Sequence, residues 1–214
     1  MQNAEIVELK PFKTVKTASE VETVINKSRF IGRCFPVCDE GEALALLLYV
    51  REAHADASHN CYAYKIGAHG ELVRFSDDGE PGGTAGLPIM EALNKSGFTN
   101  ALCVVTRYFG GILLGAGGLA RAYSGGAAAA IKAAGTAMYV PGAVIEVELN
   151  YSLYNILEGY IRGSCEVKSV EFLENVRFKV LTERKRAGDF MAGLVERANG
   201  RVEPRVVGEE YVVR

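Results

Sequence analysis

The sequence predicts a two-domain α+β protein, and three observations support this. The first half alternates strand-like runs rich in β-branched residues with runs of helical periodicity. The second half has its own order of strand, helix, two strands, helix and strand, which is that of a split-βαβ, ferredoxin-like domain. The Pro141-Gly142 pair supplies a break between the halves, so we expect domains over residues 1–138 and 142–214.

Composition narrows the class of protein. With 214 residues, of which 49% are hydrophobic and 23% charged, the chain has the composition of an ordinary globular protein with a sizeable core. Its formal charge of -2 argues against a protein coated in basic surface for duplex DNA. Neither a signal peptide nor an apolar run long enough to span a membrane is evident, and the five scattered cysteines favour free thiols. We therefore expect a soluble, cytoplasmic protein with no membrane partner.

The first half should begin with a hairpin that turns at Asn26-Lys27. Asp39 precedes Glu42 by three residues, which is typical of a capping box at a helix start, and this helix should bury Leu44, Leu47 and Leu48. The expected elements are strands over 20–25 and 28–37, a helix over 42–53, strands over 60–66 and 71–75, a helix ending at residue 95, a strand over 101–108 and a helix over 119–134.

The second half begins with a half-buried strand, in which Val and Ile alternate with Glu146 and Glu148. A helix with one apolar stripe follows. The expected elements are a strand over 143–149, a helix over 152–161, strands over 167–173 and 176–181, a helix around 190–198, and terminal strand material over 201–207 and 211–213.

A glycine-rich stretch between Arg74 and Ala134 indicates where a site lies. It contains RFSDDGEPGGTAGLP and VVTRYFGGILLGAGGLARAYSGG, and it holds half of the 24 glycines of the chain. A compact protein keeps glycine where the backbone bends through positive φ or approaches something closely. The first motif predicts a loop with three carboxylates, and the second a strand, a glycine turn and a helix. A glycine turn that opens a helix is typical of an anion site.

Two arginines should lie beside this turn: Arg107 at the end of a buried strand and Arg121 near the start of the following helix. A cation at a helix N-terminus is unfavourable by about 0.3–1 kcal/mol unless an anion is also present. In one interpretation the anions are Asp77, Asp78 or Glu80, which would hold the two glycine-rich loops together as internal ion pairs. In the other, the anion is a phosphate of RNA or of a nucleotide.

Other patterns with chemical potential are weak. His54 and His59 are five residues apart, which fits no zinc motif, and we expect no metal site. Cys34 and Cys38 lack a second pair. The glycine turn lacks the Gly-Lys-Ser/Thr ending of a phosphate-binding loop and matches a dinucleotide motif only poorly. We expect no cofactor.

RFSDDGEPGGTAGLPI and VVTRYFGGILLGAGGLARAYSGG closely resemble the two characteristic blocks of the YigZ/IMPACT family, with SRFIG and ASHNCYAYKIG at matching upstream positions. The resemblance spans roughly residues 19–135. It implies an N-terminal domain similar to the second domain of a small-subunit ribosomal protein and of elongation factor G, a fold also used by GHMP small-molecule kinases. It implies a C-terminal ferredoxin-like domain in bacterial members. Eukaryotic members are linked to restraining a starvation-sensing kinase of translation initiation.

The favoured hypothesis is a translation-linked regulator without catalysis of its own, which binds RNA, the ribosome or translation factors. Its expected anion-binding residues combine cations with the glycine turn: Lys65, Arg74, Arg107, Gly110, Gly111, Gly115, Gly117, Gly118 and Arg121. The alternative is a phosphotransferase or hydrolase for a phosphorylated substrate, with His59, Asp77, Asp78 and Glu80 as catalytic residues.

Overall fold

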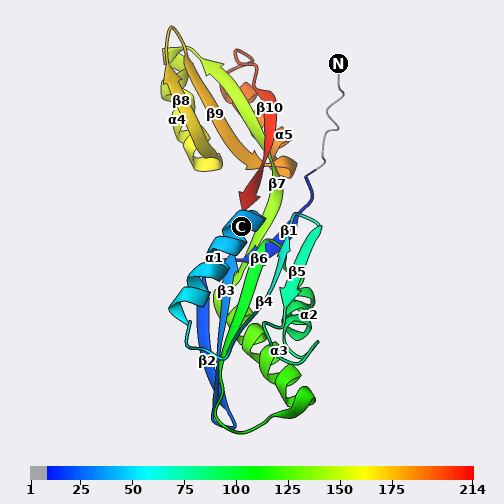
Figure 1. The fold of residues 1–214 in the computed structure, drawn as a ribbon. Coiled ribbons are helices and arrows are strands. Elements are labelled where there is room, and N and C mark those ends of the chain that lie inside the picture. The colour runs from blue at the N-terminus through cyan, green and yellow to red at the C-terminus, as the bar shows by residue number, and fades with distance from the viewer. Residues whose placement is uncertain (1–8) are drawn as a thin grey trace, which may run out of the picture. The chain divides into compact units, whose positions relative to one another are not determined.

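The structure, a computed structural model, describes residues 9–214. These residues form two compact units, one of residues 12–138 and the other of residues 139–214 with residues 9–11. We call them the N-terminal and C-terminal units. Each combines helices with an antiparallel sheet, so the chain has the expected two-domain α+β fold (Figure 1).

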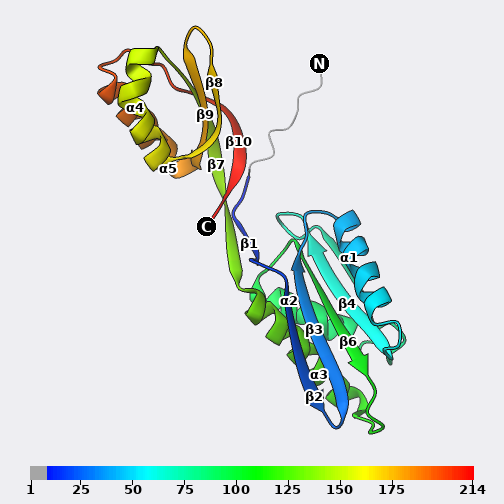
Figure 2. The ribbon, with the colours of Figure 1, turned by 90° about the vertical axis from the view of Figure 1, so that its left-hand side faces the viewer.

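The N-terminal unit is a sheet with helices on both faces (Figure 2). Its elements are β1 (Phe12–Val15), β2 (Ser19–Ile25), β3 (Ser28–Pro36), α1 (Glu40–Ala53), β4 (His59–Ile66), β5 (Leu72–Ser76), α2 (Gly86–Ser96), β6 (Ala101–Tyr108) and α3 (Gly115–Ala134). The sheet order is β2-β3-β6-β4-β5, with every neighbouring pair antiparallel. One core cluster joins the sheet to α2 and α3, and a smaller one joins its other face to α1.

The start of α1 confirms the capping box. The Asp39 carboxylate accepts a hydrogen bond from the Glu42 N–H at 2.8 Å, and the Glu42 carboxylate accepts one from the Cys38 N–H at 2.7 Å. The expected buried stripe of this helix is wrong, because Leu44 and Leu48 are 47% and 57% exposed. The helix instead buries Ala43, Leu47 and Val50 against the sheet. This stripe is rotated by about one residue, or roughly 100°.

The start of α3 also differs from the sequence expectation. The helix begins at Gly115, four residues before the expected Leu119, so part of the glycine turn is the first turn of the helix itself. Glycine is a poor helix former, and the sequence pattern therefore indicated a loop there. The end of α2 is as expected, with Gly97 in the left-handed conformation at φ +70°.

The C-terminal unit has the ferredoxin-like topology. Its elements are β7 (Thr136–Leu149), α4 (Tyr151–Ser164), β8 (Glu166–Phe172), β9 (Val176–Glu183), α5 (Arg184–Arg197) and β10 (Arg205–Val213). Within this unit the strand order is β8-β9-β7-β10, and these three pairs are antiparallel. Both helices pack on the same face of this sheet, over an aliphatic and aromatic core (Figure 2).

Pro141 and Gly142 do not interrupt the chain as the sequence suggested, because β7 continues through both residues. They pair with Tyr211 and Glu210 of β10. The fixed φ of proline lies close to the extended region, so a strand accommodates it where its missing N–H is not needed.

Three cysteines of the N-terminal unit, Cys34, Cys61 and Cys103, are fully buried thiols on the sheet. Burial raises the pKa of the Cys61 thiol to about 12. The pKa of Cys103 is also raised, by its hydrogen bond with Cys34 and by burial. All three pack as small hydrophobic groups in the core.

Gly32 on β3 allows α3 to approach the sheet closely. A Cβ at this position would lie 2.3 Å from the carbonyl oxygen of Gly126. Because the contacting atoms belong to the Gly126 backbone, they cannot move away unless the helix or the strand shifts. By contrast, a Cβ on the adjacent Gly125 would meet nothing within 4 Å.

We therefore expect Gly32→Ala to lower the free energy of unfolding by about 3 kcal/mol, the cost of overpacking against backbone. The matched substitution Gly125→Ala should raise it by about 0.5–1 kcal/mol, because alanine favours the helix. Urea unfolding of both variants measures the difference. Equal stability of the two would contradict the close packing of α3 on β3.

Candidate functional site

The glycine run after β6 makes a tight turn before α3. Gly110 lies against the turn of the β2–β3 hairpin, where an added Cβ would come within 2.1 Å of the Lys27 carbonyl carbon. Its N–H donates to Ser28 Oγ over 3.1 Å. Gly111 and Gly115 have φ angles of +82° and +68°, which glycine adopts without strain. The close approach to the hairpin requires glycine at position 110, and the positive φ angles favour glycine at positions 111 and 115.

The first turn of α3 has no side-chain cap. Its N-cap residue is Leu114, and no acidic residue lies in the turn. The first N–H groups of a helix have no partner within the helix and carry partial positive charge. Gly115 and Gly117 are exposed, Gly118 is half-buried, and none of them carries a side chain that could cover these groups. The helix therefore presents bare backbone donors.

Of the three loop carboxylates, Asp77 holds the loop itself. It accepts hydrogen bonds from the N–H groups of Gly83, Ala85 and Gly86 at 2.8, 2.9 and 2.8 Å. Burial alone would raise the pKa of Asp77, but these three donors outweigh it and the pKa is lowered. Asp77 thus acts as the N-terminal cap of α2, supplied from outside the helix.

Asp78 ties the loop to α1 and β4. One carboxylate oxygen lies 2.9 Å from Arg51 on α1, and the other accepts the Asn60 N–H at 2.7 Å. Its backbone has a φ of +45°, an uncommon conformation for a residue with a side chain. Asp78 therefore pairs with an arginine that sequence reasoning did not consider, and Asp77 forms no ion pair among the described residues.

Glu80 forms an ion pair with Arg107, as in the first of the two interpretations of the sequence. The side chains of Glu80 and Arg107 are 3% and 6% exposed, and Arg107 Nη1 lies 2.7 Å from Glu80 Oε1. The Tyr123 hydroxyl on α3 donates to the same oxygen at 2.7 Å. The guanidinium lies 5.5 Å from the centroid of the Phe30 ring and 5.3 Å from that of Phe109. One carboxylate thus joins the loop, the end of β6 and the body of α3.

A cavity of about 490 Å³ opens between these groups. We call it the α3 cavity. Its lining is Ser58, His59, Gly79, Glu80, Pro81, Arg107, Phe109, Leu113, Leu114, Gly115, Ala116 and Leu119. The lining combines a carboxylate, an imidazole and a guanidinium with the first turn of α3 and apolar side chains. The structure therefore places two of the expected site features, Arg107 and the start of α3, at one cavity.

His59 is oriented by the loop. Its Nδ1 lies 2.8 Å from the carbonyl oxygen of Asp78. Because a carbonyl oxygen only accepts, Nδ1 carries a proton. Nε2 lies 3.8 Å from Glu80 Oε1. The cavity thus holds an imidazole beside a carboxylate.

The other expected cations lie elsewhere. On β4, His59 pairs with Arg107 at one end of the sheet, whereas Lys65 pairs with Ala101 at the other. Six residues of strand separate the two positions by roughly 20 Å. Arg74 pairs with Tyr64 near that far end. Lys65 and Arg74 are therefore remote from the α3 cavity.

Arg121 lies on α3 itself. It is exposed and forms no ion pair among the described residues. An added Cβ at Gly117 would lie 3.5 Å from its NH1 atom, so the guanidinium extends along the helix toward the first turn.

Sequence reasoning missed Ser58 and Tyr123 and the apolar side chain of Leu113. Leu113 is 85% exposed at the rim of the cavity. Tyr123 is a large polar ring in a helix in which Gly and Ala predominate. A buried tyrosine hydroxyl needs a partner, which is a signal that the sequence did contain.

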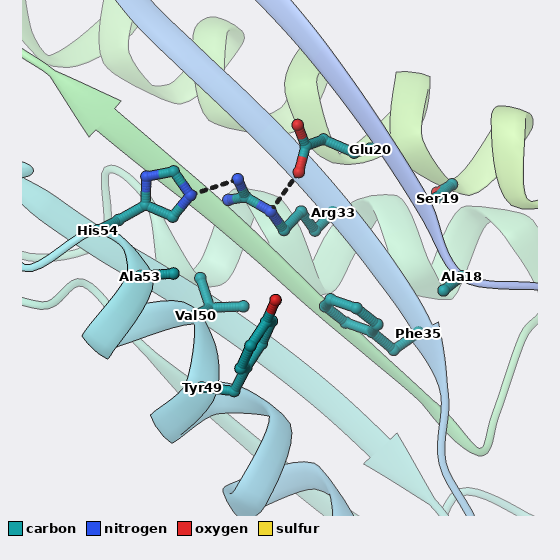
Figure 3. Close-up of a pocket in the computed structure, with 9 residues that line it drawn as sticks. All are labelled: Ala18, Ser19, Glu20, Arg33, Phe35, Tyr49, Val50, Ala53 and His54. Carbon is teal, nitrogen blue, oxygen red and sulfur yellow. Dashed lines mark hydrogen bonds and ion pairs between the residues drawn. The ribbon is translucent and has the colours of Figure 1, made fainter.

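A second cavity, of about 390 Å³, lies on the opposite face of the sheet, between α1, β2 and β3. We call it the α1 cavity. Figure 3 shows Arg33 lying between Glu20 and His54. Arg33 is 7% exposed and donates to Glu20 Oε2 at 2.8 Å, to Thr106 Oγ1 at 3.1 Å and to the Nε2 atom of His54. Its charge is satisfied internally.

His54 is held neutral by this arrangement. An arginine cannot accept a hydrogen bond, so Nε2 of His54 is the acceptor and Nδ1 carries the proton. Nδ1 lies 2.8 Å from the Tyr108 hydroxyl, which donates to Asp56 at 3.0 Å. Burial, and then the charge of Arg33, lower the pKa of His54.

No helix within residues 9–214 has the length and hydropathy of a membrane span. Within the same range, no three His, Cys, Asp or Glu side chains lie close enough together to hold a metal ion.

The fold and the α3 cavity define a two-domain α+β protein with a glycine-lined helix N-terminus. A family model described as the Impact N-terminal domain matches residues 26–131. "IMPACT family member YvyE" of Bacillus subtilis (strain 168) is 38% identical over 194 residues, which cover 90% of this chain and 89% of that protein. "IMPACT family member YigZ" of Escherichia coli (strain K12) is 34% identical over 189 residues, covering 86% and 92%. The chain belongs to the IMPACT family.

A solved structure supports the two-domain arrangement. It is described as "Crystal structure of an hypothetical protein" and is 30% identical to this chain, with a TM-score of 0.61. The match covers 94% of this chain and 99% of the other. The α+β fold therefore extends over both units.

The buried ion pair predicts a large effect of Glu80→Ala. Removal of the carboxylate leaves Arg107 as an uncompensated buried cation, so the free energy of unfolding should fall by about 3–5 kcal/mol. The control is Glu91→Ala, an exposed carboxylate on α2, which should change stability by no more than about 0.5 kcal/mol. Chemical denaturation measures both. A loss as small as that of the control would show that Arg107 does not depend on Glu80.

The lowered pKa of His54 predicts a pH dependence of stability. Between the folded pKa and the unfolded value of about 6.5, the unfolded chain binds more protons, so stability is full above that window and falls as the pH decreases through it. Urea unfolding at a series of pH values between 7.5 and 5 should show this loss. His54→Gln should flatten it, and His69→Gln, at an exposed histidine, should not. Identical profiles for wild type and His54→Gln would refute the assignment.

Proposed function

We propose that this IMPACT family member is a cytoplasmic, translation-linked regulator that binds RNA or the ribosome through the first turn of α3. The observation that carries the proposal is the bare N-terminus of α3, which opens on a cavity instead of on a side-chain cap. Such a terminus binds phosphate through backbone N–H groups and the helix dipole. The link to translation comes from the family resemblance of the sequence motifs.

The charge available to a phosphate comes mainly from exposed groups. The charge of Arg107 is balanced by Glu80 at 2.7 Å, so this arginine adds little net positive charge to the site. Arg121 is exposed on the same helix, and Lys27 is exposed at the hairpin turn beside Gly110. These two cations and the helix dipole supply the positive potential that would attract a phosphate backbone.

The carboxylates favour binding over catalysis. Asp77 caps α2, Asp78 pairs with Arg51, and Glu80 is held by Arg107 and Tyr123. A general acid or base needs a proton-accepting atom free to reach the substrate. Because all three loop carboxylates hold the fold together, the enzyme alternative has less support than the binding protein.

The proposal predicts salt-dependent binding of single-stranded RNA. Affinity should fall as salt rises, with a log–log slope of roughly -0.7 for each phosphate neutralised. Arg121→Ala should reduce the slope by about one such step, because one phosphate contact is lost. Fluorescence anisotropy of a labelled RNA over a salt series measures it.

The matched control is Lys132→Ala, an exposed cation in the last turn of the same helix, which should leave the slope unchanged. Sedimentation of the wild-type protein with ribosomes from lysate tests the translation link separately. Salt-insensitive ATP binding accompanied by hydrolysis would overturn the proposal.

A further inference from the structure

The two faces of the N-terminal sheet are covered unequally. On one face α3 packs on β2, β3 and β6, and α2 packs on β4, β5 and β6, so two helices cover the sheet from edge to edge (Figure 2). On the other face α1 packs mainly on β4 and β6, and no second helix within residues 12–138 lies beside it. The strands β2 and β3 together span roughly 10 Å, which is the diameter of one helix.

The α1 cavity lies beside α1 on this half of the face, and much of its lining is apolar. Phe35 of β3 and Val50 and Ala53 of α1 contribute to it. Figure 3 shows the ring of Tyr49 extending from α1 toward the side chains of β3. Tyr49 is 66% exposed, although it is a large aromatic residue. An exposed tyrosine beside an apolar cavity is typical of an anchor in a protein–protein interface.

The charge that this cavity presents to solvent is negative. In the ion pair of Arg33 with Glu20, the arginine side chain is 8% exposed and the carboxylate side chain is 61% exposed. Glu42 and Glu52 stand seven residues before and three residues after Tyr49, which places all three on one flank of α1. Both glutamates are exposed, and neither forms an ion pair among the described residues.

We propose that the α1 cavity and the adjoining surface of β2 and β3 dock a basic amphipathic helix of a partner protein, which lies alongside α1. An apolar side chain of that helix enters the cavity between Tyr49 and Phe35. Its Lys or Arg side chains face Glu20 and Glu42. This is the helix-in-groove mode of recognition, in which apolar anchors give affinity and complementary charges select the partner.

The same charges argue against two other occupants. A nucleic acid brings phosphates, which the exposed carboxylates repel. A second copy of this chain, packed through the same face, brings like charges together. The exposed cation of this face, Arg29, lies 2.9 Å from Glu22 and is balanced by it. The observations therefore favour a basic protein segment, and this inference does not depend on phosphate binding at the α3 cavity.

The probe is a synthetic peptide of about 18 residues, or five helical turns, with Leu at helical spacing, Lys elsewhere and one Trp in the apolar stripe. The protein has no tryptophan, so Trp fluorescence reports the peptide alone. We expect saturable binding with a blue shift of the emission. A peptide in which Leu and Lys alternate, and a helical peptide with Glu in place of Lys, should each bind about tenfold more weakly.

Tyr49→Lys should weaken binding of the helical Lys peptide about tenfold, because it removes the aromatic anchor and adds a like charge. The matched control is Leu48→Lys, at an exposed apolar residue of α1 outside the cavity lining. It adds the same charge and should weaken binding by no more than about twofold. Equal losses in the two variants would overturn the proposal, and so would the absence of saturable binding to the wild type.

The other peptides test the nature of the occupant. Equal or tighter binding of the alternating peptide would overturn the helix and indicate strand addition at the free edge of β2. Equal binding of the Glu peptide would overturn the charge complementarity. Self-association of the wild type that Tyr49→Lys abolishes would assign this face to a second copy. Saturating single-stranded RNA should leave peptide binding unchanged, and displacement of the peptide by RNA would overturn the inference of a separate protein site.

Discussion

The buried ion pair between Glu80 and Arg107 is the interaction on which the N-terminal unit depends. It connects three segments that are far apart in the chain: the carboxylate loop, the end of β6 and, through Tyr123, α3. Burial of two charges costs free energy that their attraction only partly offsets, so an apolar pair could give similar stability. What an apolar pair would not give is a fixed orientation of polar groups around a cavity.

The carboxylate loop is anchored on both faces of the sheet. Asp77 caps α2 on one face, and Asp78 reaches Arg51 of α1 on the other. The Asp78 backbone carbonyl also orients His59. The position of this imidazole therefore depends on residues from both helical layers and is set by contacts within the protein. A preformed site loses less entropy on binding than a flexible one.

The sequence predicted the local features of this fold better than the contacts between distant residues. The capping box of Asp39 and Glu42 and the Gly97 helix end follow from short-range chemistry, and both are confirmed. The buried face of α1 was wrong because several stripes of one leucine-rich helix satisfy the same periodicity. The start of α3 was wrong because helix propensity is a weak guide where glycines meet tertiary packing.

For the site residues too, the sequence predicted residue types better than contacts between distant residues. The partnership of Glu80 with Arg107 was one of two interpretations, since residue type alone cannot say which carboxylate reaches which arginine. Lys65 and Arg74 were grouped with Arg107 by charge, but the antiparallel register places them at the other end of the sheet. Register between strands separated by a helix is a property of the whole fold, and no local pattern encodes it.

The buried cysteines of the N-terminal unit can report how often its core opens to solvent. Cys34, Cys61 and Cys103 are sealed within the core, whereas Cys38 is exposed. A thiol reagent attacks the thiolate, so a core cysteine reacts only when the sheet opens to solvent. Labelling of the N-terminal unit should therefore occur in two phases, a faster one at Cys38 and a slower one whose rate reports how often the core of this unit opens. The native cysteines thus serve as a probe of local unfolding in the N-terminal unit, and no engineered label is needed.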